Sequence, residues 1–140
     1  MTPETPPGIG PDRFTEALGL ELTLVTAERV EARLDADERH QQPYGILHGG
    51  VYCSVVEAVA SHGAGRAALA MGGRGVVGVS NHTDFLRSHS RGVLDVVGTP
   101  LYVGRTVQLW TVDITRSSDG KRVSSGQVRF AVLDRLPAER

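Results

Sequence analysis

The stretch that decides the fold runs from Gln42 to Ser61 and has the sequence QPYGILHGGVYCSVVEAVAS. It opens with turn-forming residues, passes through a His-Gly-Gly triplet and continues as an apolar segment rich in Val and Ala, in which Glu57 is the only charged residue. An unpaired carboxylate on a mostly buried helix costs free energy. Glycines ahead of a helix present backbone N–H groups to a developing negative charge. The stretch therefore predicts an oxyanion site, with a base or nucleophile about two helical turns further on.

The chain has 140 residues, a formal net charge of -1 at pH 7 and one cysteine, Cys53. Its length suits one domain, which we expect to span residues 14–136 after a flexible, Pro- and Gly-rich segment of residues 1–13. The small net charge gives no electrostatic basis for binding nucleic acid or a membrane surface. A single cysteine excludes an internal disulfide framework and favours a reducing compartment. With no signal-like start and no long apolar run, a cytoplasmic location is expected.

Hydrophobic periodicity predicts one long helix among six strands. The helix is expected from Gly50 to about Met71, because the pattern is helical there and two glycines follow it. Alternating apolar residues predict strands over residues 20–24, 30–34, 76–87, 93–103, 106–114 and 123–133. This order favours an α+β fold in which a mainly antiparallel sheet wraps around a single helix. One helix cannot cover both faces of such a sheet, so self-association is expected.

The same alternation assigns strand faces, because side chains two positions apart lie on one side of a strand. Three sets of side chains are each expected to share a face: Leu20, Leu22 and Leu24; Val77, Val79 and Phe85; and Trp110, Val112 and Ile114.

Glu57 and Ser61 are four residues apart, so on a helix they lie on the same face. A general base or nucleophile beside a hydroxyl is the functional interpretation. The alternative is a polar stripe at an oligomer interface, where Glu57 is paired with a basic group. Spacing alone leaves both open. We also expect the carboxylate to be walled, and so partly desolvated, by Val55, Val56 and Val59.

The Gly49-Gly50 pair precedes the helix, which has no evident side-chain N-cap. Its N–H groups can accept a thioester carbonyl oxygen or the oxyanion formed from it. Flexibility at a loop–helix junction is the alternative for the glycines, and a structural hydrogen bond is the alternative for His48. The five histidines lack the spacing of zinc ligands, so no metal site is expected.

The string Q-x-x-G-x-x-H-G-G-x6-E-x3-S resembles the hotdog-fold acyl-CoA thioesterases of the PaaI-like kind. The similarity is closer to the 1,4-dihydroxy-2-naphthoyl-CoA, 4-hydroxybenzoyl-CoA and enterobactin proofreading thioesterases. It covers roughly residues 20–133, because it extends beyond the string to five further segments: Val76-Val77-Gly78, Leu86-Arg87-Ser88, residues 100–105, Gln108-x-Trp110 and the Asp119-Gly120-Lys121 turn. A match of this length is specific.

This resemblance implies a role for each residue of the string. Glu57 would be the catalytic carboxylate, either attacking the thioester or activating water, and the Gly49 N–H would be the oxyanion donor. Gln42 and His48 would orient the thioester, and Ser61 would position the hydrolytic water. Glu57 and Ser61 would face residues 42–49 of another subunit across a dimer interface. Coenzyme A and part of the acyl group would contact two further segments and one glycine: Gly78, Phe85, Leu86, Arg87, Ser88, Tyr102, Val103, Gly104, Arg105, Thr106 and Val107.

The chain departs from this family in two places: Phe85 stands where family members often have a His, and residues 81–84 differ from the family pattern. The acyl preference of family members therefore cannot be transferred to this chain. The sequence predicts a homodimeric or homotetrameric thioesterase that acts on an aromatic (benzoyl or naphthoyl type) acyl-CoA, with a menaquinone-pathway role as one option. No cofactor is expected beyond the coenzyme A of the substrate, and no nucleic-acid or membrane partner. Two alternatives stay open: a broad-specificity esterase or medium-chain acyl-CoA thioesterase, and a non-catalytic acyl-CoA-binding protein.

Overall fold

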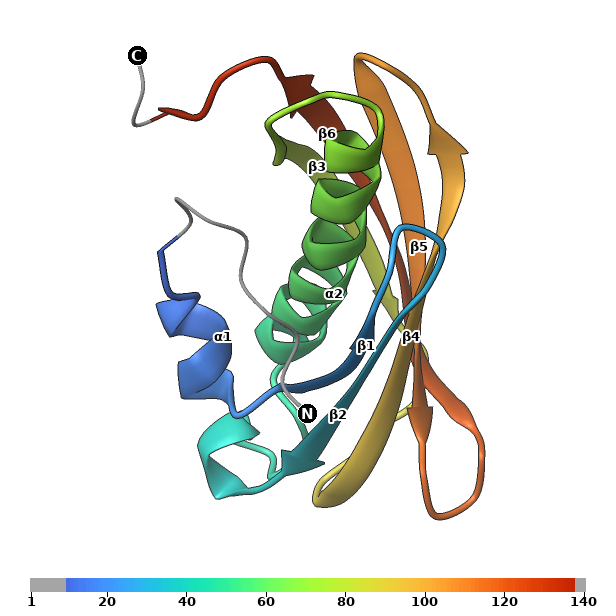
Figure 1. Ribbon diagram of the computed structural model, residues 1–140. Coiled ribbons are helices and arrows are strands. Elements are labelled where there is room, and N and C mark those ends of the chain that lie inside the picture. The colour runs from blue at the N-terminus through green and yellow to red at the C-terminus, as the bar shows by residue number, and fades with distance from the viewer. Residues whose placement is uncertain (1–9, 138–140) are drawn as a thin grey trace.

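The computed structural model describes residues 10–137, and its elements follow the predicted order within a few residues (Figure 1). The predicted N-terminal segment lies mostly outside the described residues; within them, Asp12 caps the first helix. The helices are α1 (Arg13–Leu18), the short 3-10 helix η1 (Glu38–His40) and α2 (Gly49–Ala70). The strands are β1 (Glu21–Val25), β2 (Val30–Ala36), β3 (Gly75–Phe85), β4 (Gly92–Val103), β5 (Val107–Arg116) and β6 (Arg122–Leu133).

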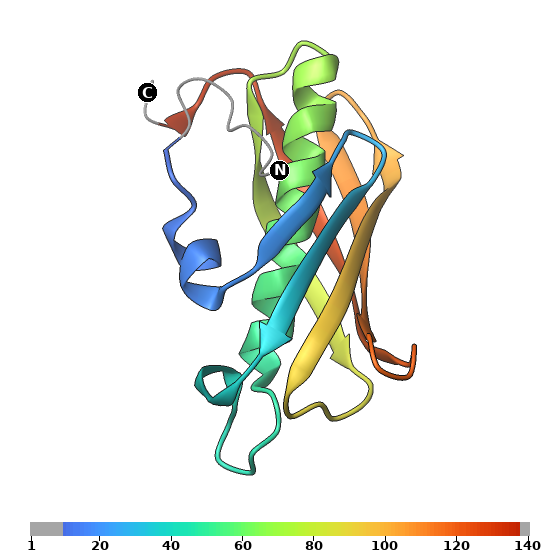
Figure 2. The same cartoon turned by 60° about the horizontal axis from the view of Figure 1, so that its bottom comes forward.

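All six strands form one antiparallel sheet in the order β1-β2-β4-β5-β6-β3. The sheet curves around α2, which lies along its concave side (Figures 1 and 2). Strands β1 and β3 are the two edges, and each presents a row of backbone groups that no neighbouring strand of the described chain pairs. The predicted α+β arrangement, a sheet wrapped around one long helix, is confirmed.

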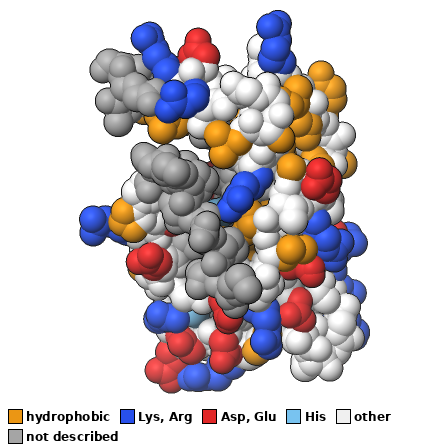
Figure 3. Space-filling view, in the orientation of Figure 1, with side chains coloured by type: hydrophobic (Ala, Val, Ile, Leu, Met, Phe, Trp, Pro, Cys, Tyr) orange, Lys and Arg blue, Asp and Glu red, His pale blue; other side chains and the backbone are white. Residues whose placement is uncertain are grey.

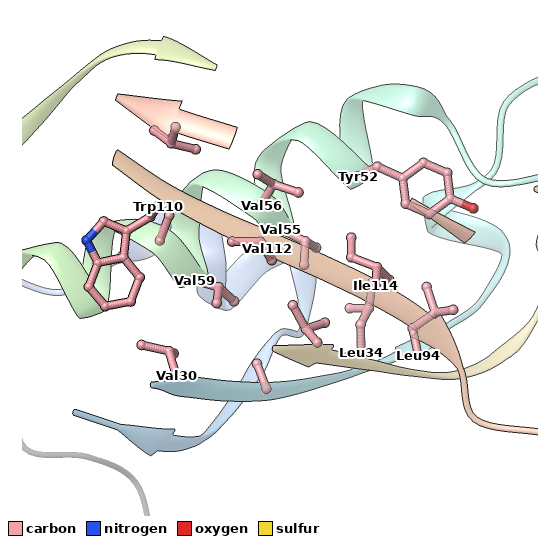
Figure 4. Packing of buried hydrophobic residues seen from close by; sticks show 14 of the residues in the cluster. Val30, Leu34, Tyr52, Val55, Val56, Val59, Leu94, Trp110, Val112 and Ile114 are labelled. Carbon is pink, nitrogen blue, oxygen red and sulfur yellow. The ribbon is translucent and has the colours of Figure 1, made fainter. Parts of the chain in front are cut away.

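One side of α2 packs into the core against the middle of the sheet (Figure 4). Val55, Val56 and Val59 are at most 1% exposed. The indole of Trp110 reaches the helix because Gly63 has no side chain; a Cβ there would lie 2.4 Å from the ring. The predicted inner face of β5 is confirmed, since three of its side chains are completely buried: Trp110, Val112 and Ile114.

Both edge strands carry a β-bulge that changes which side chains face the helix. In β1 the register shifts between Leu22 and Leu24, and Leu24 is 38% exposed. The expectation that Leu24 shares the face of Leu22 is therefore wrong. In β3 the shift lies between Gly78 and Ser80 and leaves Val79 as the extra, unpaired residue.

The predicted phase of β3 is also wrong, because one extra residue reverses the alternation of a strand. Val77 pairs with Ala131 and is 39% exposed, whereas Phe85 pairs with the buried Ser124 and faces α2. Val77, Val79 and Phe85 thus do not share one face. The bulge decides which residues of β3 meet the helix.

Charged side chains of both signs are interspersed, not gathered by sign, on the face that Figure 3 presents. No helix between residues 10 and 137 is long and apolar enough to cross a membrane.

Candidate active site

The motif loop (residues 42–48) lies beyond the N-terminal end of α2, beside the β3–β4 connection (Figure 2). The Leu47 N–H donates to the His89 carbonyl at 2.8 Å and ties the two segments together. A turn closes the loop: the Gly45 N–H donates to Gln42 O at 2.9 Å, and the Gln42 N–H donates to Ile46 O at 2.8 Å. Gly45 has a φ of 79°, a conformation that favours glycine. The loop is therefore fixed in front of the helix.

Helix α2 begins at Gly49 behind a histidine cap. His48 Nδ1 accepts from the Gly50 N–H at 2.8 Å, and His48 O accepts from the Val51 N–H at 2.9 Å. The expectation that this helix has no side-chain cap is wrong, because an imidazole nitrogen takes the place of the usual Ser or Asp oxygen. The Gly49 N–H has no acceptor among the described residues. It is a donor at the positive end of a helix dipole.

A cavity of about 280 Å³ lies beside this donor. The Phe85 ring covers Gly49 so closely that a Cβ on Gly49 would lie 2.4 Å from it, and the centroid of the Tyr52 ring is 5.7 Å from that of Phe85. The walls are mostly apolar, with an amide and a guanidinium among them: Gln42, Ile46, Leu47, Gly49, Tyr52, Phe85, Leu86, Arg87 and Ser88.

Backbone groups hold the amide and the guanidinium of this cavity. The Gln42 side-chain oxygen accepts from the Tyr44 N–H, and Arg87 Nη1 donates to the Arg122 carbonyl at 2.8 Å. Each side chain therefore has one contact that fixes it, while an amide and a guanidinium carry further donors.

The Tyr52 hydroxyl is buried and has no hydrogen-bond partner among the described residues. Burial raises the pKa of Tyr52, although the positive charge of Arg116 acts in the opposite direction. Leaving a buried hydroxyl unpaired costs about 1–3 kcal/mol. Tyr52 is therefore a neutral polar group buried in the wall of an otherwise apolar cavity.

Glu57 lies on the exposed side of α2. The valines that were expected to wall its carboxylate, Val55, Val56 and Val59, point into the core on the other side of the helix (Figure 4). That expectation is wrong, because residues one and two positions away on a helix do not face each other.

The Glu57 carboxylate faces strand β3 instead. A Cβ on Gly78 would lie 3.8 Å from its carboxyl carbon, which is van der Waals distance, so the carboxylate lies beside Gly78. Asn81 Nδ2 donates to Glu57 Oε1 at 3.4 Å. Ser61 follows one helical turn later on the same face and is half-buried. The acid is thus held between its own helix and the edge strand.

Glu57 and Gly49 of one chain are too far apart to act on one carbonyl group. Eight positions separate them on α2, which corresponds to about 12 Å along the helix axis. An attacking oxygen must come within about 3–3.5 Å of the carbonyl carbon, and an oxyanion donor lies about 2.7–3.1 Å from the oxygen. A single chain therefore carries two incomplete halves of the predicted site.

Comparison with known proteins identifies the family. Residues 44–123, more than half of the chain, match the Thioesterase superfamily. The chain belongs to this superfamily. "Putative esterase Rv1847" of Mycobacterium tuberculosis is 42% identical over 125 residues, which cover 89% of each protein. The solved structure of that protein matches with a TM-score of 0.84 at 41% identity, over 89% of this chain and 99% of that chain.

Two further relatives of this thioesterase have thioesterase names. Proofreading thioesterase EntH of Cronobacter turicensis is 32% identical over 120 residues, 86% of this chain and 85% of its own. 1,4-Dihydroxy-2-naphthoyl-CoA thioesterase 2 of Arabidopsis thaliana is 33% identical over 118 residues, 84% of this chain and 73% of its own. The predicted hotdog-fold thioesterase family is confirmed, and the protein is an enzyme of this hydrolase class.

The predicted site residues of the thioesterase fall into two groups in one chain. Gln42, Gly49 and residues 85–88 meet at the cavity, next to the His48 cap. Glu57, Ser61 and Gly78 lie together further along α2 and β3. Their catalytic and binding roles stay predictions.

The segment Tyr102–Val107 lies at the other end of the sheet from the cavity. Along β6, Val107 pairs with Ala131 and Phe85 pairs with Ser124. These two β6 positions are seven residues apart, or about 23 Å. One chain therefore does not combine Tyr102–Val107 with Phe85–Ser88 into a single binding surface.

Three residues that line or support these groups were not singled out from the sequence. Tyr52 lies among the apolar residues of α2, and nothing in the pattern distinguishes it. Asn81 and Thr83 lie in the stretch 81–84 that departs from the family pattern. That departure indicates that this stretch differs from the family. The bulge that turns both residues toward α2 cannot be recognised from the sequence.

Proposed function

We propose that this thioesterase hydrolyses the thioester of an acyl-CoA to the free acid and coenzyme A. The observation that carries the proposal is the Gly49 N–H, a donor without an acceptor among the described residues, at a helix start beside an apolar cavity. Such a donor stabilises the negative charge that develops on a carbonyl oxygen under attack. A thioester is an activated acyl donor, so a carboxylate, a water molecule and an oxyanion donor suffice for its hydrolysis.

Glu57 supplies the carboxylate. In one route its oxygen attacks the carbonyl carbon, the C–S bond breaks and water hydrolyses the resulting anhydride. In the other route Glu57 takes a proton from water as the water oxygen attacks the carbon. Both routes consume one water molecule, regenerate Glu57 and give the free acid and the protonated thiol of coenzyme A. Ser61 positions the water, and Gln42 and His48 orient the thioester.

The active site in this proposal is shared between two copies of the chain. The 12 Å axial separation between Gly49 and Glu57 requires the acid of one copy to face the motif loop of another. The unpaired edge of β3, with Val77 and Val79 exposed beside it, suits antiparallel pairing with a second β3. The result is a homodimer, or a homotetramer built from two such dimers.

We infer an aromatic acyl group from the walls of the cavity. Tyr52 and Phe85 present two rings beside Gly49, and aromatic rings pack favourably on other rings. A volume of about 280 Å³ suits one acyl group and not a whole acyl-CoA. The names of relatives that include naphthoyl-CoA fit this choice. In this proposal Arg87 and, from another copy, Arg105 bind the phosphates of coenzyme A.

The experiment is steady-state hydrolysis of a panel of benzoyl-, naphthoyl- and medium-chain acyl-CoA thioesters and p-nitrophenyl esters. We expect the highest kcat/KM with an aromatic acyl-CoA. Glu57→Ala should lower kcat by about 100-fold or more with a smaller change in KM, as expected for a group that acts in the transition state. Ser54→Ala is the matched control, because Ser54 lies on α2 three residues before Glu57 and its hydroxyl is bonded to Gly50 O at 2.7 Å.

The panel also tests the rival activities. Relatives named as esterases favour a second candidate, a broad-specificity esterase, which would show comparable turnover of p-nitrophenyl esters. A preference for medium-chain thioesters would replace the aromatic assignment. Wild-type turnover by Glu57→Ala would remove Glu57 from the chemistry. Tight binding without turnover of any substrate would indicate a non-catalytic acyl-CoA-binding protein.

A further inference from the structure

The bulge at Val79 turns two polar residues of β3 toward the face of α2 that carries Glu57. Before the bulge Gly78 pairs with Phe130, and after it Asn81 pairs with Val128. Phe130 and Val128 are completely buried, so their partners also face the helix. Without an extra residue, alternation from Gly78 would place residues 80 and 82 on this side. Bulges next to active sites often re-aim side chains in this way.

The Asn81 side chain makes three hydrogen bonds, and two of them reach the turn of α2 that carries Glu57. Its Nδ2 donates to Cys53 O at 3.0 Å and to Glu57 Oε1 at 3.4 Å. Cys53 is the residue one helical turn before Glu57. The amide therefore connects the helix backbone at that turn with the carboxylate.

Thr83 fixes which way the amide points. Its hydroxyl donates to Asn81 Oδ1 at 2.7 Å, which leaves the NH₂ group to face α2. The hydroxyl has its place because Gly126, the partner of Thr83 on β6, lacks a side chain; a Cβ there would lie 2.6 Å from Thr83 Oγ1. Gly126 thus makes room for the Thr83 hydroxyl, the hydroxyl orients the Asn81 amide, and the amide contacts the Glu57 carboxylate.

We propose that Asn81, oriented by Thr83, is a positioning residue that holds the Glu57 carboxylate in its reactive direction. This inference rests on the proposed function, in which Glu57 is the catalytic acid. An exposed glutamate samples many rotamers, and a fixed donor reduces that freedom before substrate binds. The 3.4 Å contact is longer than an ideal hydrogen bond, and such contacts often tighten when the substrate complex forms.

A purely structural role is the competing explanation, because the bond to Cys53 O also fastens β3 to α2. The two explanations differ in kinetics. A positioning role lowers kcat, acts through Glu57 and depends on the Thr83 hydroxyl. A structural role lowers stability and affects activity in any background.

The test measures kcat and KM for the preferred acyl-CoA in Asn81→Ala, alone and combined with Glu57→Ala. We expect Asn81→Ala to lower kcat by about tenfold or more with KM within about twofold, as for the loss of one hydrogen bond to a charged group. In the Glu57→Ala background the same change should cost no further activity, because its target is gone. A loss of the same factor in both backgrounds overturns the inference.

Thr83 provides a matched pair of variants that keeps the test valid if Asn81→Ala folds poorly. Thr83→Ser keeps the hydroxyl and should keep wild-type kcat, whereas Thr83→Val keeps the shape and should lower kcat by several-fold. Equal kcat in the two variants overturns the role of the hydroxyl. If Glu57→Ala keeps wild-type turnover, the proposed role of Glu57 fails, and this inference fails with it. If Glu57→Ala is impaired while Asn81→Ala and Thr83→Val are not, the proposed function stands and only this inference fails.

Discussion

Strand β5 lies inside the sheet and strand β3 lies at its edge, and the two strands face the same helix with opposite kinds of residue. The inner face of β5 is regular and completely buried, from Gln108 to Ile114. Its one polar side chain there is satisfied: Gln108 donates to Ala64 O at 3.1 Å and accepts from Trp110 Nε1 at 2.8 Å. The inner face of β3 is broken by a bulge and is small or polar beside Glu57.

The two sides of α2 therefore differ in role: the side against β5 contributes to stability, and the side against β3 carries the proposed catalytic acid. The side of α2 against β5 is closely packed, so a lost side chain there leaves a void. The side against β3 has a glycine and an amide beside an exposed carboxylate, so the acid is accessible. Substitutions on the two sides should therefore have separable effects, and the following variants test that separation.

The largest effect is expected from Trp110→Ala, which removes the largest completely buried side chain from the β5 side. The free energy of unfolding should fall by about 3–5 kcal/mol, because the cavity next to Gly63 cannot be refilled by the rigid helix. Urea denaturation of wild type and variant measures this difference.

Tyr102→Ala is the matched aromatic control, since the Tyr102 side chain is 56% exposed. Its unfolding free energy should change by less than about 1 kcal/mol. If Trp110→Ala is no more destabilising than Tyr102→Ala, packing between α2 and β5 is not a main source of the protein's stability.

The smallest effect is expected from Asp12→Ala, which lies outside both sides of the comparison. Asp12 caps α1 by accepting from the Thr15 N–H at 3.2 Å, and its Oδ2 lies 3.5 Å from His62 Nε2 on α2. Removing a helix N-cap costs about 1 kcal/mol. Thermal unfolding should detect this loss, while kcat should stay at the wild-type value because neither Glu57 nor the cavity is touched.

The Asp12 contribution should depend on pH. Burial acts to raise the pKa of Asp12, but the hydrogen bonds of Thr15 and the charge of His62 together lower the pKa below its usual value. A lowered pKa in the folded state adds stability above about pH 4, and this stability disappears as the pH falls through the folded pKa. The difference between wild type and Asp12→Asn, which keeps a capping oxygen without the charge, should therefore vanish in acid; a constant difference would contradict this account.

The regular parts of the fold could be predicted from sequence because their periodicity is undisturbed. Trp110, Val112 and Ile114 alternate without a break, and Gly72-Gly73 marks the end of α2. The faces of β1 and β3 could not be predicted, because a single extra residue reverses the alternation of a strand. The extra residues, Thr23 and Val79, look like ordinary strand residues in the sequence. Local pattern does not show where a bulge falls.

The candidate site divides in the same way. Gln42, Gly49 and Phe85 were singled out from the sequence for different roles, and the three line one cavity. The histidine cap and Asn81 were missed, because a ring nitrogen is an unusual cap and Asn81 reaches Glu57 only through tertiary structure. Glu57 and Gly49 are about 12 Å apart along one helix, so in the proposed function they act together only across two chains.

The central claim, a site shared between two chains, is tested by mixing two inactive variants. Glu57→Ala removes the acid. The double variant Gly49→Pro/Phe85→Ala removes the N–H donor at the first helical position, and its second change makes room for the proline ring, because a Cβ on Gly49 would lie 2.4 Å from the Phe85 ring. Each variant alone should lose about 100-fold or more in kcat. After subunit exchange at equal ratio, mixed dimers hold one site with both groups intact, so about one quarter of wild-type turnover should return. If mass spectrometry shows mixed dimers and activity stays at the level of the separate variants, Glu57 and Gly49 do not act on the same thioester from different chains.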